Sequence, residues 1–266
     1  MDNLNLFNNK AENYVKARPN YAKMLIEKLK TYNLGNESTA ADIGCGTGIF
    51  ARQLLEIGAK VYGVEINAEM RNKAEVNLTA FHNFVSVNAC AEDTNLADDS
   101  VDFITCAQSF HWFDKKKFKA ECKRILKDDG YVALVWNTKD NNAQSVKELS
   151  DLTEKYCKNF VGFNGGTRND IEEIKEFFDG KYEYFEFDNP LEYDEEKFIE
   201  RCLSSSYALV KDDENYEAYV KELKSFFEKY QINGIYKMPN KSELYIGKIE
   251  KWLGFKPNHF LFISNL

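Results

Sequence analysis

The sequence predicts an α/β fold built on a doubly wound, mostly parallel sheet of seven strands. Two observations predict it. Short, continuous apolar runs alternate with longer segments of helical spacing over residues 39–137, and a glycine-rich turn, "DIGCGTG", ends the first of these runs. Continuous apolar runs are typical of parallel strands that are buried on both faces. Strands that alternate with helices form right-handed βαβ units, and these build such a sheet.

The strand candidates can be read in chain order. Five of them lie in the alternating region, at residues 39–43, 60–66, 84–89, 101–107 and 130–136. Two more follow: 182–187, where apolar and polar residues alternate, and 242–249. We expect these two to close the sheet as a hairpin-like pair, because the segment between them reads as helical.

The helix candidates fill the spaces between strands. Apolar residues at helical spacing predict helices over 22–30, 49–57, 68–80, 114–126, 146–160, 195–203 and 215–230. Asp114 is the expected N-cap of the fourth helix, and Gly130 is the expected stop signal after it.

No linker rich in proline, glycine or serine divides the chain, so we expect one domain over residues 1–266. Within it we expect N-terminal lid helices over 1–35 and a cofactor-binding core over 36–187. A small helical cap is expected over 188–240, lying at the C-terminal ends of the strands. A closing strand and tail are expected over 241–266.

Composition excludes several classes of protein. With 43 acidic and 35 basic residues the formal net charge is -8, which argues against general nucleic acid binding. The sequence contains neither a membrane-spanning apolar run nor a signal peptide, so a cytoplasmic location and no membrane partner are expected. The 6 cysteines are scattered singly, without the spacing of a metal site, and we expect reduced thiols and no bound metal. Oligomeric state is not predicted.

The glycine turn is the strongest functional signal. In an open α/β sheet, ligands bind beyond the carboxyl ends of the strands, and this turn follows the first strand. Gly44 and Gly46 allow the backbone to approach a ligand closely, because neither carries a Cβ atom. Glu65 ends the next strand, where its carboxylate can accept hydrogen bonds from a ribose diol.

The spacing of the glycines separates two classes of nucleotide cofactor. A dinucleotide site requires G-x-G-x-x-G/A, and its third small residue would fall at Ile49, which is too large. The third glycine is instead Gly48, and with Asp42 the pattern becomes D-x-G-x-G-x-G. This pattern resembles motif I of class I S-adenosylmethionine-dependent methyltransferases, whose sheet is Rossmann-like. The resemblance implies S-adenosylmethionine as cofactor and S-adenosylhomocysteine as product.

The resemblance assigns further cofactor contacts to this chain. After the third strand, "NACAEDTNL" is similar to the family's adenine-binding segment, which places Ala91 and Glu92 at the adenine. Cys90 departs from an Asp that is common there, so the contact is expected on backbone groups or on Glu92. Ile66, beside Glu65, and Ala107, the last residue of the fourth strand, complete the expected contacts.

Two segments resemble a narrower subgroup that includes enzymes acting on small organic acids. They are "YVKARPNY", which matches Y-x-x-x-R-P, and "AQSFHWF" after the fourth strand. The first would bring Tyr14 and Arg18 over the cofactor, where a guanidinium can bind the methionyl carboxylate. A surface arginine paired with an acid is the alternative for Arg18.

The second segment contributes His111 and Trp112 as substrate-side candidates. The ordinary pKa of histidine suits a general base, so His111 is the catalytic candidate; packing under the N-terminal helix is the alternative for both residues. "SSSY" at 204–207 resembles a substrate-side segment, which makes Tyr207 a substrate contact or simply a helix end.

Together these features predict methyl transfer to a small molecule, more readily at oxygen, in a carboxylate or hydroxyl, than at nitrogen or carbon. Two alternatives stay open. One is methylation of tRNA or protein, for which no N-P-P-Y-type segment follows the fourth strand. The other is a non-catalytic protein that binds the cofactor.

Overall fold

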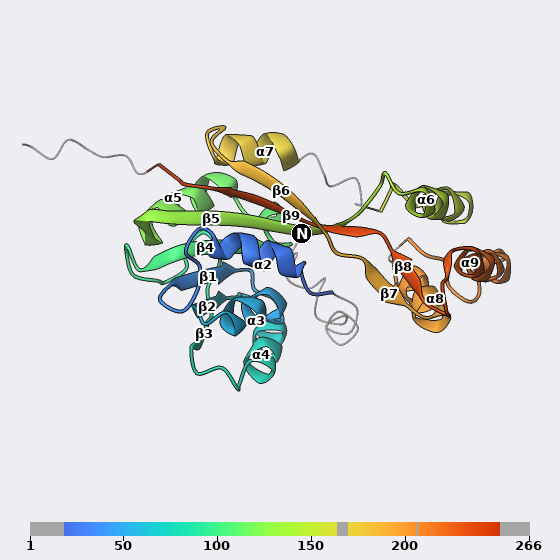
Figure 1. Ribbon diagram of the computed structural model, residues 1–266, viewed down its shortest axis with the longest axis horizontal. Helices are drawn as coiled ribbons and strands as arrows, with labels where there is room; N and C mark the ends of the chain where they lie inside the picture. The colour runs from blue at the N-terminus through green and yellow to red at the C-terminus, as the bar shows by residue number, and fades with distance from the viewer. Residues whose placement is uncertain (1–18, 164–169, 206, 251–266) are drawn as a thin grey trace, which may run out of the picture.

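The computed structural model describes residues 19–163, 170–205 and 207–250. Seven strands form one sheet in the order β3-β2-β1-β4-β5-β9-β6 (Figure 1). The strands are β1 (Thr39–Ile43), β2 (Lys60–Val64), β3 (Phe84–Val87), β4 (Val101–Ala107), β5 (Leu126–Lys139), β6 (Glu183–Asp188) and β9 (Asn240–Gly247). β1 to β5 are parallel, and β9 runs antiparallel to both β5 and β6. The predicted seven-stranded, mostly parallel sheet is therefore confirmed.

The helices lie where the apolar spacing predicts them, with ends that shift by a few residues. They are α2 (Lys23–Lys30), α3 (Ile49–Glu56), α4 (Ala68–Asn77), α5 (Lys115–Ile125), α6 (Gln144–Tyr156), α8 (Glu195–Leu203) and α9 (Tyr216–Tyr230). Asp114 caps α5 as predicted, accepting hydrogen bonds from the backbone N–H groups of Lys116 and Lys117. Four short elements of the described chain were not predicted: the 3-10 helix η2 (Phe110–Trp112), α7 (Asp170–Phe177), β7 (Leu191–Tyr193) and β8 (Tyr236–Met238).

Gly130 corrects one expectation, because it does not stop a helix. It lies inside β5, which begins directly after α5. A Cβ atom at this position would come within 2.6 Å of the Leu126 side chain and 2.8 Å of the carbonyl oxygen of Asp102. Close packing beside the irregular β4–β5 register therefore requires glycine here.

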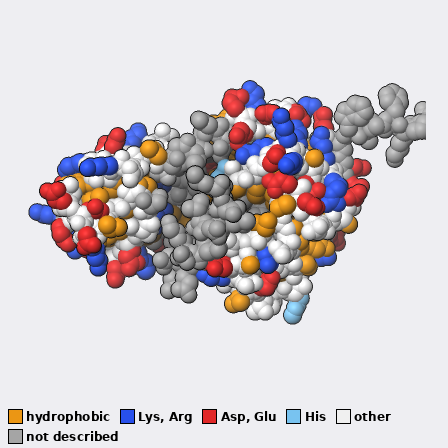
Figure 2. Space-filling model, turned by 180° about the vertical axis from the view of Figure 1, so that it is seen from behind, with side chains coloured by type: hydrophobic (Ala, Val, Ile, Leu, Met, Phe, Trp, Pro, Cys, Tyr) orange, Lys and Arg blue, Asp and Glu red, His pale blue; other side chains and the backbone are white. Residues whose placement is uncertain are grey.

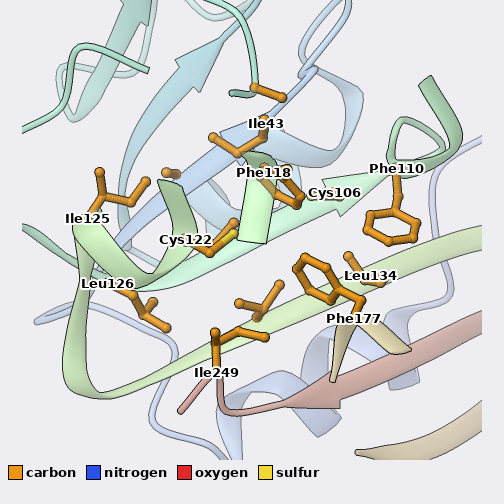
Figure 3. Packing of buried hydrophobic residues seen from close by; sticks show 14 of the residues in the cluster. Ile43, Cys106, Phe110, Phe118, Cys122, Ile125, Leu126, Leu134, Phe177 and Ile249 are labelled. Carbon is orange, nitrogen blue, oxygen red and sulfur yellow. The ribbon is translucent and has the colours of Figure 1, made fainter. Parts of the chain in front are cut away.

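Helices cover both faces of the sheet. On one face, α5 and α7 bury Phe118, Cys122 and Phe177 against Ile43 and other strand residues, and Figure 3 shows these side chains pointing toward one another. Phe118 and Phe177 stack with ring centroids 5.6 Å apart. Truncating such a fully buried phenylalanine to alanine costs roughly 3–5 kcal/mol. On the other face, α2 and α3 pack over the sheet.

The only part of the predicted lid that the structure describes is the segment that contains α2. Leu25, Ile26 and Leu29 are buried against the sheet, and the backbone N–H of Ala22 donates a hydrogen bond to Ser242 Oγ at 2.9 Å. In this region α2 is thus a packed layer of the core. Residues 1–18 lie outside the described residues.

The segment between β6 and β9 forms a separate cluster, which we call the insert (residues 189–239). It contains β7, α8, α9 and β8, and Figure 1 shows it beside α6, away from the main sheet. β7 and β8 pair as an antiparallel ribbon. Phe198, Tyr219 and Phe227 form its own apolar core, which Leu149 of α6 joins. The insert corresponds in sequence to residues 188–240, the segment for which a helical cap was predicted, and it contains two strands as well as two helices.

The described surface is polar and mixed in charge. On the face that Figure 2 shows, acidic and basic side chains are interspersed both over the insert and over the part that contains the main sheet. Among the described residues, no helix combines the length and apolar character needed to cross a bilayer.

Candidate functional site

The glycine turn after β1 adopts a conformation that other residues rarely tolerate. Gly44, Gly46 and Gly48 all have positive φ, at 66°, 57° and 83°. The N–H of Gly44 donates to the carbonyl of Val64 at 2.8 Å, which fixes the turn against the end of β2. Gly48 is the left-handed N-cap of α3.

The three glycines face different surroundings. A Cβ atom would lie 2.7 Å from the Ser109 side chain at Gly44 and 2.7 Å from Leu78 Cδ1 at Gly48. At Gly46 it would meet nothing within 4 Å, and Gly46 lines a cavity of about 600 Å³. The turn therefore packs tightly at two glycines and offers open backbone to a ligand at the third.

Glu65 follows β2 and is held by the turn. Its Oε2 accepts from the N–H of Gly46 at 2.9 Å, and its Oε1 accepts from the N–H of Asn67 at 2.8 Å. Burial raises the pKa of this carboxyl, while those backbone N–H groups oppose the shift. Each carboxylate oxygen can accept a further hydrogen bond, and Glu65 lines the cavity.

Asp42 lies below the turn and, like Gly48, does not line the cavity, whereas Gly44 and Gly46 do. It is fully buried, and its Oδ1 accepts from Thr105 Oγ1 at 2.8 Å. Its Oδ2 lacks a hydrogen-bond partner of good geometry, and burial raises the pKa of Asp42 to about 7. The structure thus gives Asp42 a supporting position under the turn, not a direct place at a ligand.

The remaining predicted cofactor contacts of the described chain lie on the cavity wall. They are Ile66, Ala91, Glu92 and Ala107. Glu92 also has a structural partner, because its Oε1 accepts from the N–H of Asp114 at 2.8 Å. That bond ties the predicted adenine segment to the start of α5. Tyr14 and Arg18 lie outside the described residues.

Sequence reasoning missed two neighbours of Ala107 that shape this wall. Ser109 Oγ donates to the carbonyl of Ile43 at 2.7 Å, which joins the loop after β4 to the end of β1. Gln108 has a φ of 60° and donates from Nε2 to the carbonyl of Asn137 at 2.9 Å. Both residues belong to the "AQSFHWF" segment. The resemblance therefore pointed to this segment, but the sequence did not show that these two side chains bond to the ends of β1 and β5.

Of the predicted substrate-side residues, one lines the cavity and two do not. Trp112 lines the cavity and is 50% exposed. His111 is not among the lining residues; its ring lies 4.8 Å from the ring of Trp112. Tyr207 packs inside the insert, with its ring 4.9 Å from that of Phe160, and does not line the main cavity.

The far wall of the cavity was not predicted. It includes the end of β5 and parts of the insert, which contribute Lys139, Tyr193, Arg201, Met238 and Asn240. Lys139 Nζ lies 3.7 Å from the centre of the Phe163 ring. Burial, with a smaller contribution from the charge of Arg201, lowers the pKa of Lys139 to about 7.

These walls enclose one cavity of about 600 Å³, which runs from the glycine turn to the insert. This volume falls within the range of small-molecule and cofactor sites. The groups at the glycine-turn end of the cavity fit a nucleoside. Gly46 leaves room for a ligand against the backbone, and Glu65 presents acceptors suited to a ribose diol. S-adenosylmethionine is such a nucleoside, and it has no phosphate for the turn to bind.

Comparison with known proteins agrees with this site. Residues 41–134 match the family model of a methyltransferase domain. An uncharacterized methyltransferase of Schizosaccharomyces pombe is 32% identical over 63% of this chain and 63% of its own length. One of Mycobacterium bovis is 33% identical over 52% of this chain and 55% of its own. The chain thus spans less than two thirds of the length of these relatives.

Solved structures share the fold. A protein assigned as a type II methyltransferase of Anaeromyxobacter dehalogenans superposes with a TM-score of 0.61 at 19% identity, covering 86% of this chain and 95% of that one. A protein assigned as a methyltransferase of an antibiotic biosynthesis pathway in Anabaena variabilis gives 0.54 at 22% identity, covering 83% and 96%. Residues 41–134 thus match a methyltransferase domain in sequence, and the solved structures share the fold that surrounds it.

Proposed function

We propose that the protein transfers the methyl group of S-adenosylmethionine to a small-molecule acceptor, at an oxygen atom. The observation that carries this proposal is the cavity of about 600 Å³ that runs from the glycine turn to the insert. One end suits the nucleoside, and the other leaves a side-chain-lined space for an acceptor. A macromolecular acceptor would instead need an open surface next to the sulfonium.

The residues at the glycine-turn end of the cavity each have a role in this proposal. The carboxylate of Glu65 accepts from the ribose hydroxyls, while the N–H groups of Gly46 and Asn67 hold it in place. Backbone groups of Ala91 receive the adenine edge, and Ile66 covers the nucleoside. Arg18 is assigned to the methionyl carboxylate by the resemblance alone.

The cofactor, when bound, supplies a methyl group that is already activated by the sulfonium. The protein then has to align the acceptor with that group and exclude water, and positioning of this kind can account for most of the rate. A carboxylate acceptor has no proton to lose and needs no general base. The placement of His111, off the cavity wall in the described chain, agrees with such an acceptor.

Calorimetry with S-adenosylhomocysteine tests the cofactor site. We expect binding by the wild-type protein and a loss of at least tenfold in affinity for Glu65→Ala, because a carboxylate bonded to the ribose is removed. Glu69→Ala, an exposed change on α4, is the matched control. Absence of binding, or equal binding by Glu65→Ala, would contradict the proposal.

A methyl-transfer screen tests the reaction. Small carboxylic acids, phenols and amines are offered separately, and formation of S-adenosylhomocysteine is measured. We expect turnover with oxygen acceptors. Turnover only with tRNA or protein substrates would replace the proposal, and cofactor binding without turnover of any acceptor would favour a non-catalytic role.

A further inference from the structure

The cavity presents two basic side chains, Lys139 and Arg201, on the wall formed by β5 and the insert. We propose that they form a binding site for an anionic group of the acceptor, a carboxylate or a phosphate. The inference rests on the proposed function, since it places the acceptor in that cavity. It adds a charge requirement for the substrate and names the residues that impose it.

The topology separates this site from the nucleoside end. Lys139 ends β5, Glu65 follows β2, and two strands, β1 and β4, lie between them in the sheet. Neighbouring strands are about 4.8 Å apart, so the two ends lie roughly 14 Å apart across the sheet. The cavity therefore presents a carboxylate at Glu65 and basic groups at Lys139 and Arg201, at separate places on its wall.

Neither cation has a carboxylate partner within the described parts of the chain. Lys139 Nζ lies over the Phe163 ring, and Arg201 Nη1 makes a long contact of 3.4 Å to Ser205 Oγ. Most lysines elsewhere in the insert are paired, as Lys237 is with Glu192 at 2.8 Å. Two partly buried cations on one cavity wall, neither paired with a carboxylate among the described residues, are unfavourable until an anion binds.

The other titratable groups around this pair supply no negative charge at neutral pH. They are Cys202 on α8, Tyr193 on β7, Tyr207 after α8 and Tyr219 on α9. Burial raises the pKa of each of these groups, and that of Cys202 to about 12. They remain neutral, so none of these described groups supplies a counter-charge to Lys139 and Arg201.

The side chains of Arg201 and Lys139 suit an anion in two ways. Arg201 offers a planar fork of N–H donors, and Lys139 adds a point charge from a different element. Because the pKa of Lys139 is about 7 without an anion, an incoming negative charge raises it and the amine takes up a proton. Binding should thus strengthen as the pH falls through about 7.

The test uses the full-length protein and four variants: Lys139→Met, Lys139→Arg, Arg201→Met and Lys237→Met. Lys139→Arg keeps the charge but cannot titrate near neutral pH, and Lys237→Met is the control in the insert. Succinate, inorganic phosphate and uncharged succinamide are titrated by calorimetry, with and without S-adenosylhomocysteine. Titrations at pH 7 in two buffers of different ionisation enthalpy measure proton uptake.

We expect succinate or phosphate to bind and succinamide not to bind; which of the two anions binds more tightly tells carboxylate from phosphate. Lys139→Met and Arg201→Met should weaken binding at least tenfold, whereas Lys237→Met should not. The wild type should take up about half a proton at pH 7, and Lys139→Arg should bind with no uptake.

Three results would overturn the inference: no binding of either anion, equal binding of succinamide, or unchanged binding by both Lys139→Met and Arg201→Met. These results are independent of the cofactor site. Failure to bind S-adenosylhomocysteine would count against the proposed function, while anion binding in its absence would still support the site at Lys139 and Arg201.

Discussion

The carboxylate of Glu65 accepts a hydrogen bond from the backbone N–H of Gly46, with Oε2 and the nitrogen 2.9 Å apart. This bond joins the end of β2 to the glycine turn after β1, so the acidic residue and the turn form one rigid unit. The second oxygen is held by the N–H of Asn67. A ligand at Gly46 therefore meets a carboxylate whose position is already fixed.

Glu65→Gln should damage this unit more than its small chemical change suggests. The amide group of glutamine would turn an NH₂ toward one of the two backbone donors, leaving that N–H without an acceptor. We expect a loss of about 1–3 kcal/mol in the free energy of unfolding, measured in urea, and weaker S-adenosylhomocysteine binding. Glu69→Gln serves as the exposed control; an unchanged affinity in Glu65→Gln would show that the geometry of this carboxylate is unimportant.

Gly46→Ala and Gly48→Ala should fail in different ways. Both place a side chain at positive φ, which costs about 1–2 kcal/mol. Gly48→Ala also drives its Cβ atom to 2.7 Å from Leu78, whereas Gly46→Ala meets nothing within 4 Å. We expect the greater loss of stability in Gly48→Ala. For each variant, the loss of cofactor affinity is measured by calorimetry and the loss of stability by urea unfolding. We expect the ratio of the first loss to the second to be greater in Gly46→Ala. The reverse order would mean that the open side of Gly46 is not where the cofactor binds.

Asp42 should make stability depend on pH. Its pKa is raised to about 7 in the folded protein, above that of an unfolded aspartate, so the folded state holds a proton that the unfolded state releases. Its contribution is present below about pH 4 and is lost as the pH rises toward 7, by at most roughly 4 kcal/mol. Relative to wild type, Asp42→Asn should therefore gain stability between pH 4.5 and 8. Parallel unfolding curves across this range would contradict the buried, protonated state.

His111→Asn should keep most of the methyl transfer. Its ring contacts Trp112 and is not on the cavity wall in the described chain. Loss of a general base lowers rates about 10²–10⁴-fold, so a smaller loss with an unchanged pH profile is expected. Trp112→Leu, which alters the wall itself, should raise the KM for the acceptor. A fall of 10² or more in kcat for His111→Asn would restore the histidine as the base.

Sequence patterns located the sheet because its central strands β1, β4 and β5 are mostly buried on both faces. Continuous apolar runs such as 101–107 need no tertiary information to be read as strands. The elements that were missed are short. β7 and β8 have three residues each, too few to show a period, and α7 has eight.

The sequence by itself determined the glycine turn and the acid beside it, since Gly44, Gly46 and Gly48 are required by local backbone conformation and Glu65 follows the adjacent strand. Only the tertiary structure decided the rest. It buried Asp42 beneath the turn, because the strand that carries it is covered on both faces. It also brought Lys139, at the end of β5, to the same cavity as Arg201 of α8. No local sequence pattern predicts that these two side chains line one cavity, because their proximity depends on how the insert between β6 and β9 folds.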